Sequence, residues 1–245
     1  MSKLTYIIIL VFFNICFVGC DNANDLLNQH IKDGPIVYAG KIKELTARSG
    51  YYRVRLNLFP TEDANRSHCL LTWNIGGTDK DSIRVNYVAS NYDEKIKGYY
   101  AIVDLPTIEG SLQITAQNVD AYGNKSLVET VNANIYGTDY ISALANAPAK
   151  VSPQVDKITF EERVGAVGNI ISYEKTDGSF TEEIFVKEKS YSLVDAKRGG
   201  IVRTKTRFLI NETDIDTLDV TTFLETEIPI NEGIDAVMAS RSGGR

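Results

Sequence analysis

Hydrophobic and polar residues alternate along most of the chain between residues 36 and 137. The clearest example is Tyr52–Leu58, where apolar side chains occupy every second position, and residues 69–75 and 83–87 repeat the pattern. A period of two is typical of strands that bury one face. Further runs of this kind follow, and turn-forming segments separate them, among them TEDANRS, GGTDKD and DAYGNKS. About seven short antiparallel strands in about 100 residues predict a β-sandwich.

A second stretch of strand patterns begins at Pro148. The preceding residues, 138–147, start with the candidate N-caps Thr138 and Asp139, which predicts a short connecting helix. Alternation then returns in residues 148–228, where Thr176-Asp177-Gly178 predicts a hairpin turn. We therefore expect a second, smaller β-sandwich there. The polar, glycine-rich residues 229–245 are expected to be disordered.

The end of the first predicted sandwich resembles a fibronectin type III domain. In LPTIEGSLQITAQNVDAYGNKS, Leu105-Pro106 matches the corner before strand F of that family, and Gly123-Asn124 matches its F–G turn. Leu112 stands where the family usually has a tyrosine, and it shares the expected inward face with Ile114 and Ala116. Together with the strand patterns, the resemblance implies an all-β protein of two tandem immunoglobulin- or fibronectin type III-like β-sandwiches joined by a short helix.

The amino-terminal residues have the pattern of an export signal. The apolar run Leu4–Val18 is shorter than the roughly 20 residues that a helix needs to cross a bilayer. Residues 17–20, FVGC, resemble a bacterial lipobox, although the first of them is not the usual leucine. The resemblance implies a cleaved signal peptide at residues 1–19, acylation of Cys20 and a polar tether at residues 20–35. The alternative is an uncleaved anchor with an unmodified cysteine.

Composition narrows the class of protein further. The formal net charge is -6, whereas proteins that bind nucleic acid are normally basic, so we expect no nucleic-acid partner. Cys16 would leave with the signal and Cys20 would carry lipid, which leaves Cys69 as the one thiol of an exported chain. No intramolecular disulfide can then form, and the hydrophobic core alone must stabilise the fold.

The sequence contains no residues at the spacing of a catalytic or metal site. His68 and Cys69 are neighbours on a predicted strand, so their side chains point to opposite faces, and we expect Cys69 to be buried. His30 and His68 have no second histidine or cysteine at a ligand spacing. Acidic pairs such as Glu161-Glu162 are explained more simply as solvated surface than as a glycosidase pair. We predict a protein without enzymatic activity, metal ion or cofactor.

Two features are candidates for contact with a ligand. Tyr92 lies in a predicted loop, where an exposed ring could stack on a sugar. A basic stripe on one face of a predicted strand could receive an anionic glycan or an acidic partner, and it consists of Arg203, Lys205 and Arg207. The alternative for this stripe is cross-strand pairing with carboxylates, for which the sequence offers Glu182, Glu183 and Glu188.

The chain as a whole resembles a family of surface lipoproteins of the Bacteroidetes that has no assigned function. The likeness includes the lipobox, the start DGPIVYAGKIKELTARSGYYRVRLN, the DAYGNKS turn followed by IYGTDY, and the ending RFLINETDIDTLDV. Relatives of this kind often continue into a discoidin-type sugar-binding domain. Exported proteins of that phylum carry an O-glycosylation signal that Asp81-Ser82-Ile83 and Asp216-Thr217-Leu218 resemble, which implies Ser82 and Thr217 as attachment sites.

These observations favour a non-enzymatic lipoprotein, anchored through Cys20 in the outer membrane and exposed at the cell surface. Its sandwiches would act as a binding or spacer module, for which the family likeness suggests polysaccharide as the ligand. The alternative is a structural or adhesive module that contacts another envelope protein through its surface or its strand edges. An envelope hydrolase is a third hypothesis, which is disfavoured because the sequence offers no nucleophile, base or metal constellation.

Overall fold

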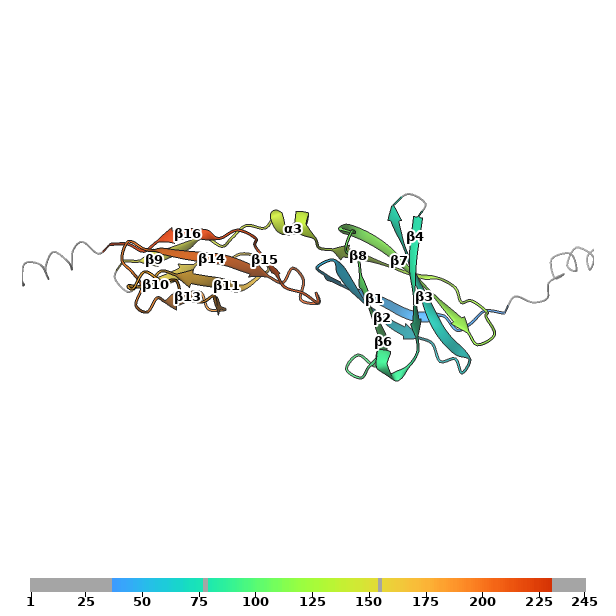
Figure 1. Ribbon diagram of the computed structural model, residues 1–245. Coiled ribbons are helices and arrows are strands. Elements are labelled where there is room, and N and C mark those ends of the chain that lie inside the picture. Colours follow the sequence, from blue (N-terminus) through green and yellow to red (C-terminus); the bar gives the residue numbers. More distant parts are fainter. Residues whose placement is uncertain (1–36, 77–78, 154–155, 231–245) are drawn as a thin grey trace, which may run out of the picture.

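The computed structural model describes residues 37–76, 79–153 and 156–230. Its amino-terminal part contains two antiparallel sheets, drawn in blue to green in Figure 1. One sheet has the strand order β1-β2-β6-β5, and the other has the order β4-β3-β7-β8. The bounds are β1 Ile42–Gly50, β2 Arg53–Pro60, β3 Arg66–Gly76, β4 Asp79–Asn86, β5 Tyr92–Asp93, β6 Gly98–Asp104, β7 Gly110–Asp120 and β8 Glu129–Ile135, with a 3-10 turn η1 at Ala89–Asn91.

These two sheets pack face to face around one hydrophobic core. Leu56 of β2, Leu71 of β3 and Ile114 of β7 are fully buried and belong to the same cluster. Arg55 points to the other face of β2, where its guanidinium lies over the Tyr100 ring. Burial of each large apolar side chain stabilises the fold by about 1.5–3 kcal/mol relative to exposure. The expected alternation along β2 is confirmed at Val54, Leu56 and Leu58, which are fully buried. It is wrong at Asn57, which was expected on the polar face but is only 6% exposed, and Tyr52 lies in the turn before the strand.

The segment that resembles a fibronectin type III domain has the expected side-chain directions. Its three inward residues are all buried, namely Leu112, Ile114 and Ala116. After β7, the Asp120 carboxylate accepts hydrogen bonds from the backbone N–H groups of Tyr122 and Asn124, at 2.9 and 2.8 Å. Gly123 has a φ of 86°, in the left-handed region that favours glycine. The sequence of this turn therefore specifies a tight connection between β7 and β8.

The carboxy-terminal part contains two further antiparallel sheets with a core of their own. Buried and half-buried residues alternate strictly along β14, which pairs with β11 on one side and with β15 and β16 in succession on the other. The second sheet has the order β13-β10-β9, and the core includes the fully buried Ile158, Ile171 and Val202. The bounds are β9 Ala149–Ser152, β10 Lys157–Phe160, β11 Ala166–Tyr173, β12 Ile184–Val186, β13 Ser190–Ser192, β14 Ile201–Phe208, β15 Leu218–Asp219 and β16 Leu224–Glu227.

The hairpin turn expected at residues 176–178 is present, but the strand after it is shorter than its sequence pattern suggests. Gly178 has a φ of 82°, as such a turn requires. The strand β12 begins only at Ile184. Before it, the Thr181 hydroxyl accepts a hydrogen bond from the Tyr173 N–H at 3.2 Å. In a regular strand pair, a backbone carbonyl would accept this hydrogen bond.

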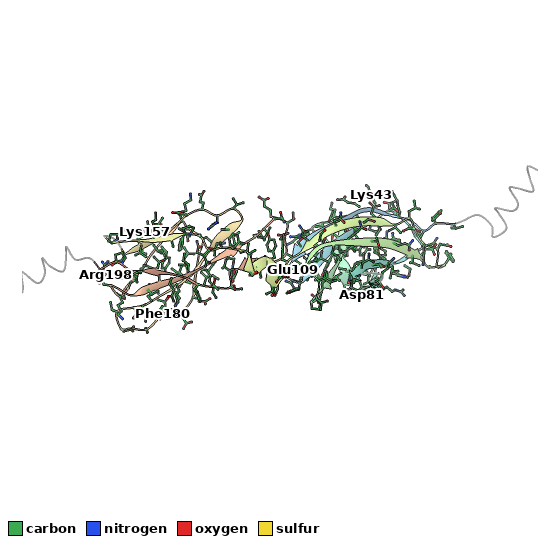
Figure 2. All side chains as sticks on the ribbon, turned by 90° about the horizontal axis from the view of Figure 1, so that it is seen from above. Lys43, Asp81, Glu109, Lys157, Phe180 and Arg198 are labelled. Atoms are coloured by element: carbon green, nitrogen blue, oxygen red, sulfur yellow. The ribbon has the colours of Figure 1, made fainter. Side chains whose placement is uncertain are left out.

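A short helix, α3 (Thr138–Ser142), lies between β8 and β9. It is shorter than the expected 138–147, and the expected caps Thr138 and Asp139 are wrong, because Gly137 is the N-cap and no side-chain cap bond forms there. Glu109 takes over the capping role, since its carboxylate accepts hydrogen bonds from the N–H groups of Asp139 and Tyr140 at 3.1 and 2.5 Å. Figure 2 shows Glu109 between the two parts of the fold.

The all-β fold class is confirmed, with several antiparallel sheets and little helix in the described part of the chain. The division into two domains, at residues 36–137 and 148–228, stays a prediction. Cys20, the predicted signal peptide and tether, and most of the predicted tail lie outside the described residues. Within residues 37–76, 79–153 and 156–230, no helix has the length and apolar character that spanning a bilayer requires.

Candidate functional site

One loop of the carboxy-terminal part contacts the amino-terminal sheets directly. This junction loop, residues 209–217, joins β14 to β15 and lies against the turn between β1 and β2. Ile215 N–H donates to the Ser49 carbonyl at 2.8 Å, and Tyr51 N–H donates to the Asp216 carboxylate at 2.9 Å. Backbone groups of the turn and polar groups of the loop therefore form hydrogen bonds with each other, so neither set is left without a partner.

Asp216 forms the ion pair of this junction. Arg53 donates to both of its carboxylate oxygens, from Nε at 2.8 Å and from Nη2. A bidentate pair of this kind has a fixed geometry and is stronger than a single neutral hydrogen bond. The hydrogen bond from Arg53 keeps the pKa of Asp216 below its ordinary value, so the carboxylate stays ionised at neutral pH.

Two buried residues of the junction, Tyr136 and Asp214, form a polar cluster with the exposed Asn211. The Tyr136 hydroxyl donates to the Asp214 carboxylate at 2.9 Å, and the Asn211 side-chain amide donates to the Tyr136 oxygen at 2.9 Å. Asp214 also accepts a hydrogen bond from the Asn211 N–H at 2.9 Å. Burial, followed by the hydrogen bond to Asp214, raises the pKa of Tyr136. The hydroxyl therefore stays protonated and acts as a donor.

The close approach of the junction loop requires a glycine on the other side. A Cβ atom at Gly50 would lie 2.5 Å from the Asp216 Oδ2 and 2.7 Å from the Ile215 side chain. Neither neighbour could remain in place, because real Cβ contacts are essentially never shorter than about 3 Å. The next turn residue, Tyr52, has a φ of 50°, so the chain reverses within two residues.

Beside the junction loop, the surface is hollowed into an open groove of about 710 Å³. We call it the junction groove, and its lining includes Tyr51, Tyr52, Arg53, Asp104, Asp216 and Thr217. The two tyrosine rings meet edge to face with their centroids 4.7 Å apart, and 41% of the Tyr51 surface is exposed. The Tyr52 hydroxyl is fixed by Thr138, whose N–H donates to it at 3.1 Å. The groove thus offers aromatic surface beside carboxylates.

A second hollow, of about 400 Å³, lies between β10 and β11. Its lining is rich in charged side chains, among them Glu161, Glu162, Arg163 and Lys189, and Lys189 forms an ion pair with Glu162. The one aromatic residue in this lining, Phe160, is 6% exposed and belongs to the core. We therefore favour the junction groove as the candidate site.

The basic stripe on β14 is largely neutralised by its neighbours. Arg203 pairs with Glu225 at 3.0 Å, and Arg207 donates to both oxygens of Asp219 at 2.6 and 2.7 Å. These partners, on β16 and β15, replace the expected Glu182 and Glu188. The hydrogen bond to Asp219 raises the pKa of Arg207, and the nearby charge of Glu183 adds a weaker attraction in the same direction. The three cations also cover phenyl rings: Arg203 over Phe180, Lys205 over Phe223 and Arg207 over Phe185.

The other candidate residues lie apart from the junction groove or at its rim. Tyr92, in β5, is half-buried, and its ring packs edge to face with Tyr99 at a centroid distance of 5.1 Å. Ser82 is exposed on β4, and Thr217 is exposed where it lines the groove. Ligand contact at Tyr92 and at the stripe, and O-glycosylation at Ser82 and Thr217, stay predictions.

The Cys69 thiol is buried, as expected. It is 0% exposed, and burial raises its pKa to about 12. His68 points to the other face of β3, and burial lowers its pKa. In residues 37–76, 79–153 and 156–230, no group of three or more histidine, cysteine or acidic side chains is placed to hold a metal ion.

Sequence patterns missed the junction almost entirely. Tyr51-Tyr52 and Asp214/Asp216 are visible as an aromatic doublet and an acidic pair, but Arg53 and Asp216 are separated by 163 positions. A signal was available in residues 211–217, NETDIDT, which interrupt the strand alternation with polar residues after β14. That signal identifies a loop and does not say which surface the loop contacts.

Comparisons with known proteins give one family. A family model described as a domain of unknown function matches residues 20–218. No curated protein matches the chain. Among solved structures, the FN1–FN3 domains of chicken CNTN1 are similar at 10% identity and a TM-score of 0.36, with 79% of this chain and 69% of that one covered. A two fibronectin type III domain segment from chicken tenascin is similar at 12% identity and a TM-score of 0.30, covering 76% and 99%. TM-scores this low carry no argument, so the fold description depends on the sheets and cores alone.

Proposed function

Since this chain belongs to the DUF4998 family, a domain of unknown function, we propose its function from its own chemistry. It is a non-catalytic binding module that captures polysaccharide in the junction groove. Lipid on Cys20 holds it in the outer membrane with its sheets at the cell surface. The two tandem sandwiches act as a single stiff unit, joined by α3 and by the junction loop.

The observation that carries this proposal is the aromatic and carboxylate lining of the junction groove. Sugars stack their C–H faces on aromatic rings, and tyrosine presents such a ring at a low cost in side-chain entropy. Carboxylates accept hydrogen bonds from sugar hydroxyls, and Asp104 and Asp216 lie beside Tyr51. An open groove suits one stretch of a long chain, whereas small molecules are usually enclosed.

Two observations support attachment at Cys20. Residues 17–20 resemble a lipobox, and the family match begins at the cysteine itself. Mass spectrometry of the full-length protein purified from envelopes tests the proposal. An acylated Cys20 at the amino terminus is expected. An intact leader with an unmodified cysteine would exclude lipid anchoring.

Glycan binding by the full-length protein tests the capture proposal. Polysaccharides are screened on an array, and the affinity of any binder is measured by calorimetry for the wild type, Tyr51→Ala and Tyr92→Ala. Loss of the Tyr51 ring is expected to weaken binding by about tenfold. The comparison is with a nucleic-acid base stacked on an aromatic side chain, which contributes roughly 1–3 kcal/mol. Tyr92→Ala tests the alternative site predicted from the sequence, and it is expected to bind normally because the proposed site is the junction groove. Binding that depends on Tyr92 alone would move the site to β5, and the absence of any sugar binding would exclude capture.

A structural module that contacts another envelope protein is the second candidate. The edge strand β4 favours it, because within the described residues β4 pairs on one side only, with β3. An unpaired strand edge can receive a strand from a partner. Lys80, Asp81 and Arg84 place charges along this strand, which opposes such pairing. Co-purification of one envelope protein that is lost when Ile83 is changed to Pro would favour this candidate.

A further inference from the structure

Five exposed apolar side chains lie at the end of the fold where the chain begins. We call them the N-terminal patch, and they are Val37 (61% exposed), Tyr38 (58%), Tyr122 (77%), Leu127 (60%) and Val128 (52%). Val37 and Tyr38 precede β1, and the other three belong to the connection between β7 and β8. Exposed apolar side chains on neighbouring segments of a surface commonly mark a contact with a partner or a membrane.

Hydrogen bonds hold the two segments of the N-terminal patch together. Ala39 N–H donates to the Lys125 carbonyl at 3.3 Å, and the Asn118 side-chain amide donates to the Gly40 carbonyl at 2.7 Å. The Ser126 hydroxyl donates to the Leu127 carbonyl at 2.7 Å. The patch is therefore a defined surface whose backbone is fixed on both sides.

The position of this patch relates it to the proposed lipid anchor. Residues 21–36 are all that separates Cys20 from Val37, and even fully extended they reach only about 55 Å. Figure 1 shows that the chain enters at this end of the molecule, opposite the carboxy-terminal sheets. If lipid anchors Cys20, this end of the fold faces the bilayer at short range.

The composition of the patch suits a lipid surface. Tyrosine is favoured at membrane interfaces, because its ring is apolar while its hydroxyl reaches water or a headgroup. Leu127 and Val128 supply aliphatic surface beside Tyr122. The exposed ammonium groups of Lys41 and Lys125 lie next to the patch in sequence, where they can approach lipid phosphates.

We propose that the N-terminal patch lies against the surface of the bilayer in which Cys20 is anchored, so that the protein has a fixed orientation on the membrane. This inference rests on the proposed anchoring. The acyl chain and the patch then provide two contacts with lipid, and a chain with two contacts dissociates far less readily than one with a single contact. The junction groove, at the other end of the amino-terminal sheets, is thereby kept away from the lipid.

Fluorescent labels on the full-length acylated protein test the orientation. The environment-sensitive dye NBD is attached to Tyr122→Cys or, as control, to Thr176→Cys in the turn after β11, which follows the end of that strand away from the junction loop. Buried Cys69 does not compete for the label. The proteins are reconstituted in vesicles of phosphatidylethanolamine and phosphatidylglycerol with or without a spin-labelled quencher lipid. The label at position 122 is expected to shift to the blue and to lose several-fold in emission with the quencher. The label at position 176 is expected to change little.

Each other outcome overturns a specific statement. A label at position 122 that emits as in water, on protein whose acylation is shown by mass, would refute the lipid contact while leaving the anchoring intact. A blue shift without quenching would mean that protein covers the patch, which also refutes it. Absence of the acyl group from the mass spectrum would refute the anchoring itself. Leu127→Ser/Val128→Ser, with the label at position 122, is expected to lose most of the quenching, because its backbone hydrogen bonds are retained while its apolar surface is removed.

Discussion

The Tyr136 hydroxyl and the Asp214 carboxylate form a buried polar pair. Removal of the hydroxyl oxygen alone tests how much this pair contributes to stability. Tyr136→Phe removes the donor to Asp214 and the acceptor for Asn211. We expect the free energy of unfolding to fall by about 1–3 kcal/mol, because a buried carboxylate loses a partner. Urea denaturation measures the loss. Tyr122→Phe, the same change on an exposed ring, is the control and is expected to have no effect. An equal loss in both variants would contradict this role.

The Asp216 carboxylate makes the junction sensitive to acid. Its folded pKa lies below the ordinary value of 3.8, chiefly through the hydrogen bond from Arg53. The stability that it contributes is therefore fully present above the unfolded pKa and is lost as the pH falls through the folded pKa. We expect the wild type to lose more stability than Asp216→Asn when urea unfolding is repeated at about pH 3 instead of pH 7. Parallel losses in the two proteins would show that the pair contributes little.

At the scale of elements, the turn between β1 and β2 determines whether the junction loop can dock. Gly50→Ala places a Cβ atom against Asp216 and Ile215, so we expect residues 211–217 to lose protection from hydrogen exchange. Gly178→Ala is the matched control, since a Cβ atom there meets nothing within 4 Å. Its φ of 82° costs about 1 kcal/mol of strain, but the junction should remain protected. Unchanged protection in Gly50→Ala would refute the close approach.

Local sequence predicted the strands far better than it predicted which other elements contact them. Alternation located the buried apolar positions of β2 and β14, because a period of two depends on adjacent residues alone, but it missed the buried Asn57. The cap of α3 could not be predicted in this way, since Glu109 reaches it from another element. The partners of the basic stripe were wrong for the same reason: β15 and β16 are short, and their pairing with β14 is set by the fold.

At the scale of the whole molecule, the junction loop should limit the relative motion of the two parts. Spin labels at Tyr122→Cys and Thr176→Cys report their separation by pulsed electron resonance. We expect a narrow distance distribution in the wild-type background and a broader one after Arg53→Ala/Asp216→Ala, which removes the ion pair. Arg203→Ala/Glu225→Ala removes an ion pair elsewhere and is the control. A broad distribution in the wild-type background would mean that the junction does not restrict motion.

The candidate site could not be predicted because its walls come from opposite ends of the described chain. Tyr51 was noticed as part of a doublet, and Asp216 and Thr217 as part of a triplet, yet nothing in either motif indicates that the other lies beside it. Only the packing of the loop that follows β14 against the first hairpin brings them together. The sequence shows which side chains are present. It does not show that Arg53 and Asp216, which are 163 positions apart, lie side by side in the folded protein.

The shared construction of the junction groove has a thermodynamic consequence. A saccharide that touches both Tyr51 and Thr217 binds only when the two parts are docked, so its occupancy must strengthen their cohesion. Linkage gives the size of the effect: about 2.7 kcal/mol when the free ligand is at about 100 times its dissociation constant. Calorimetric melts with saturating ligand should then merge two overlapping transitions into one cooperative transition. On the proposed function, the bound polysaccharide would thus itself keep the two parts docked.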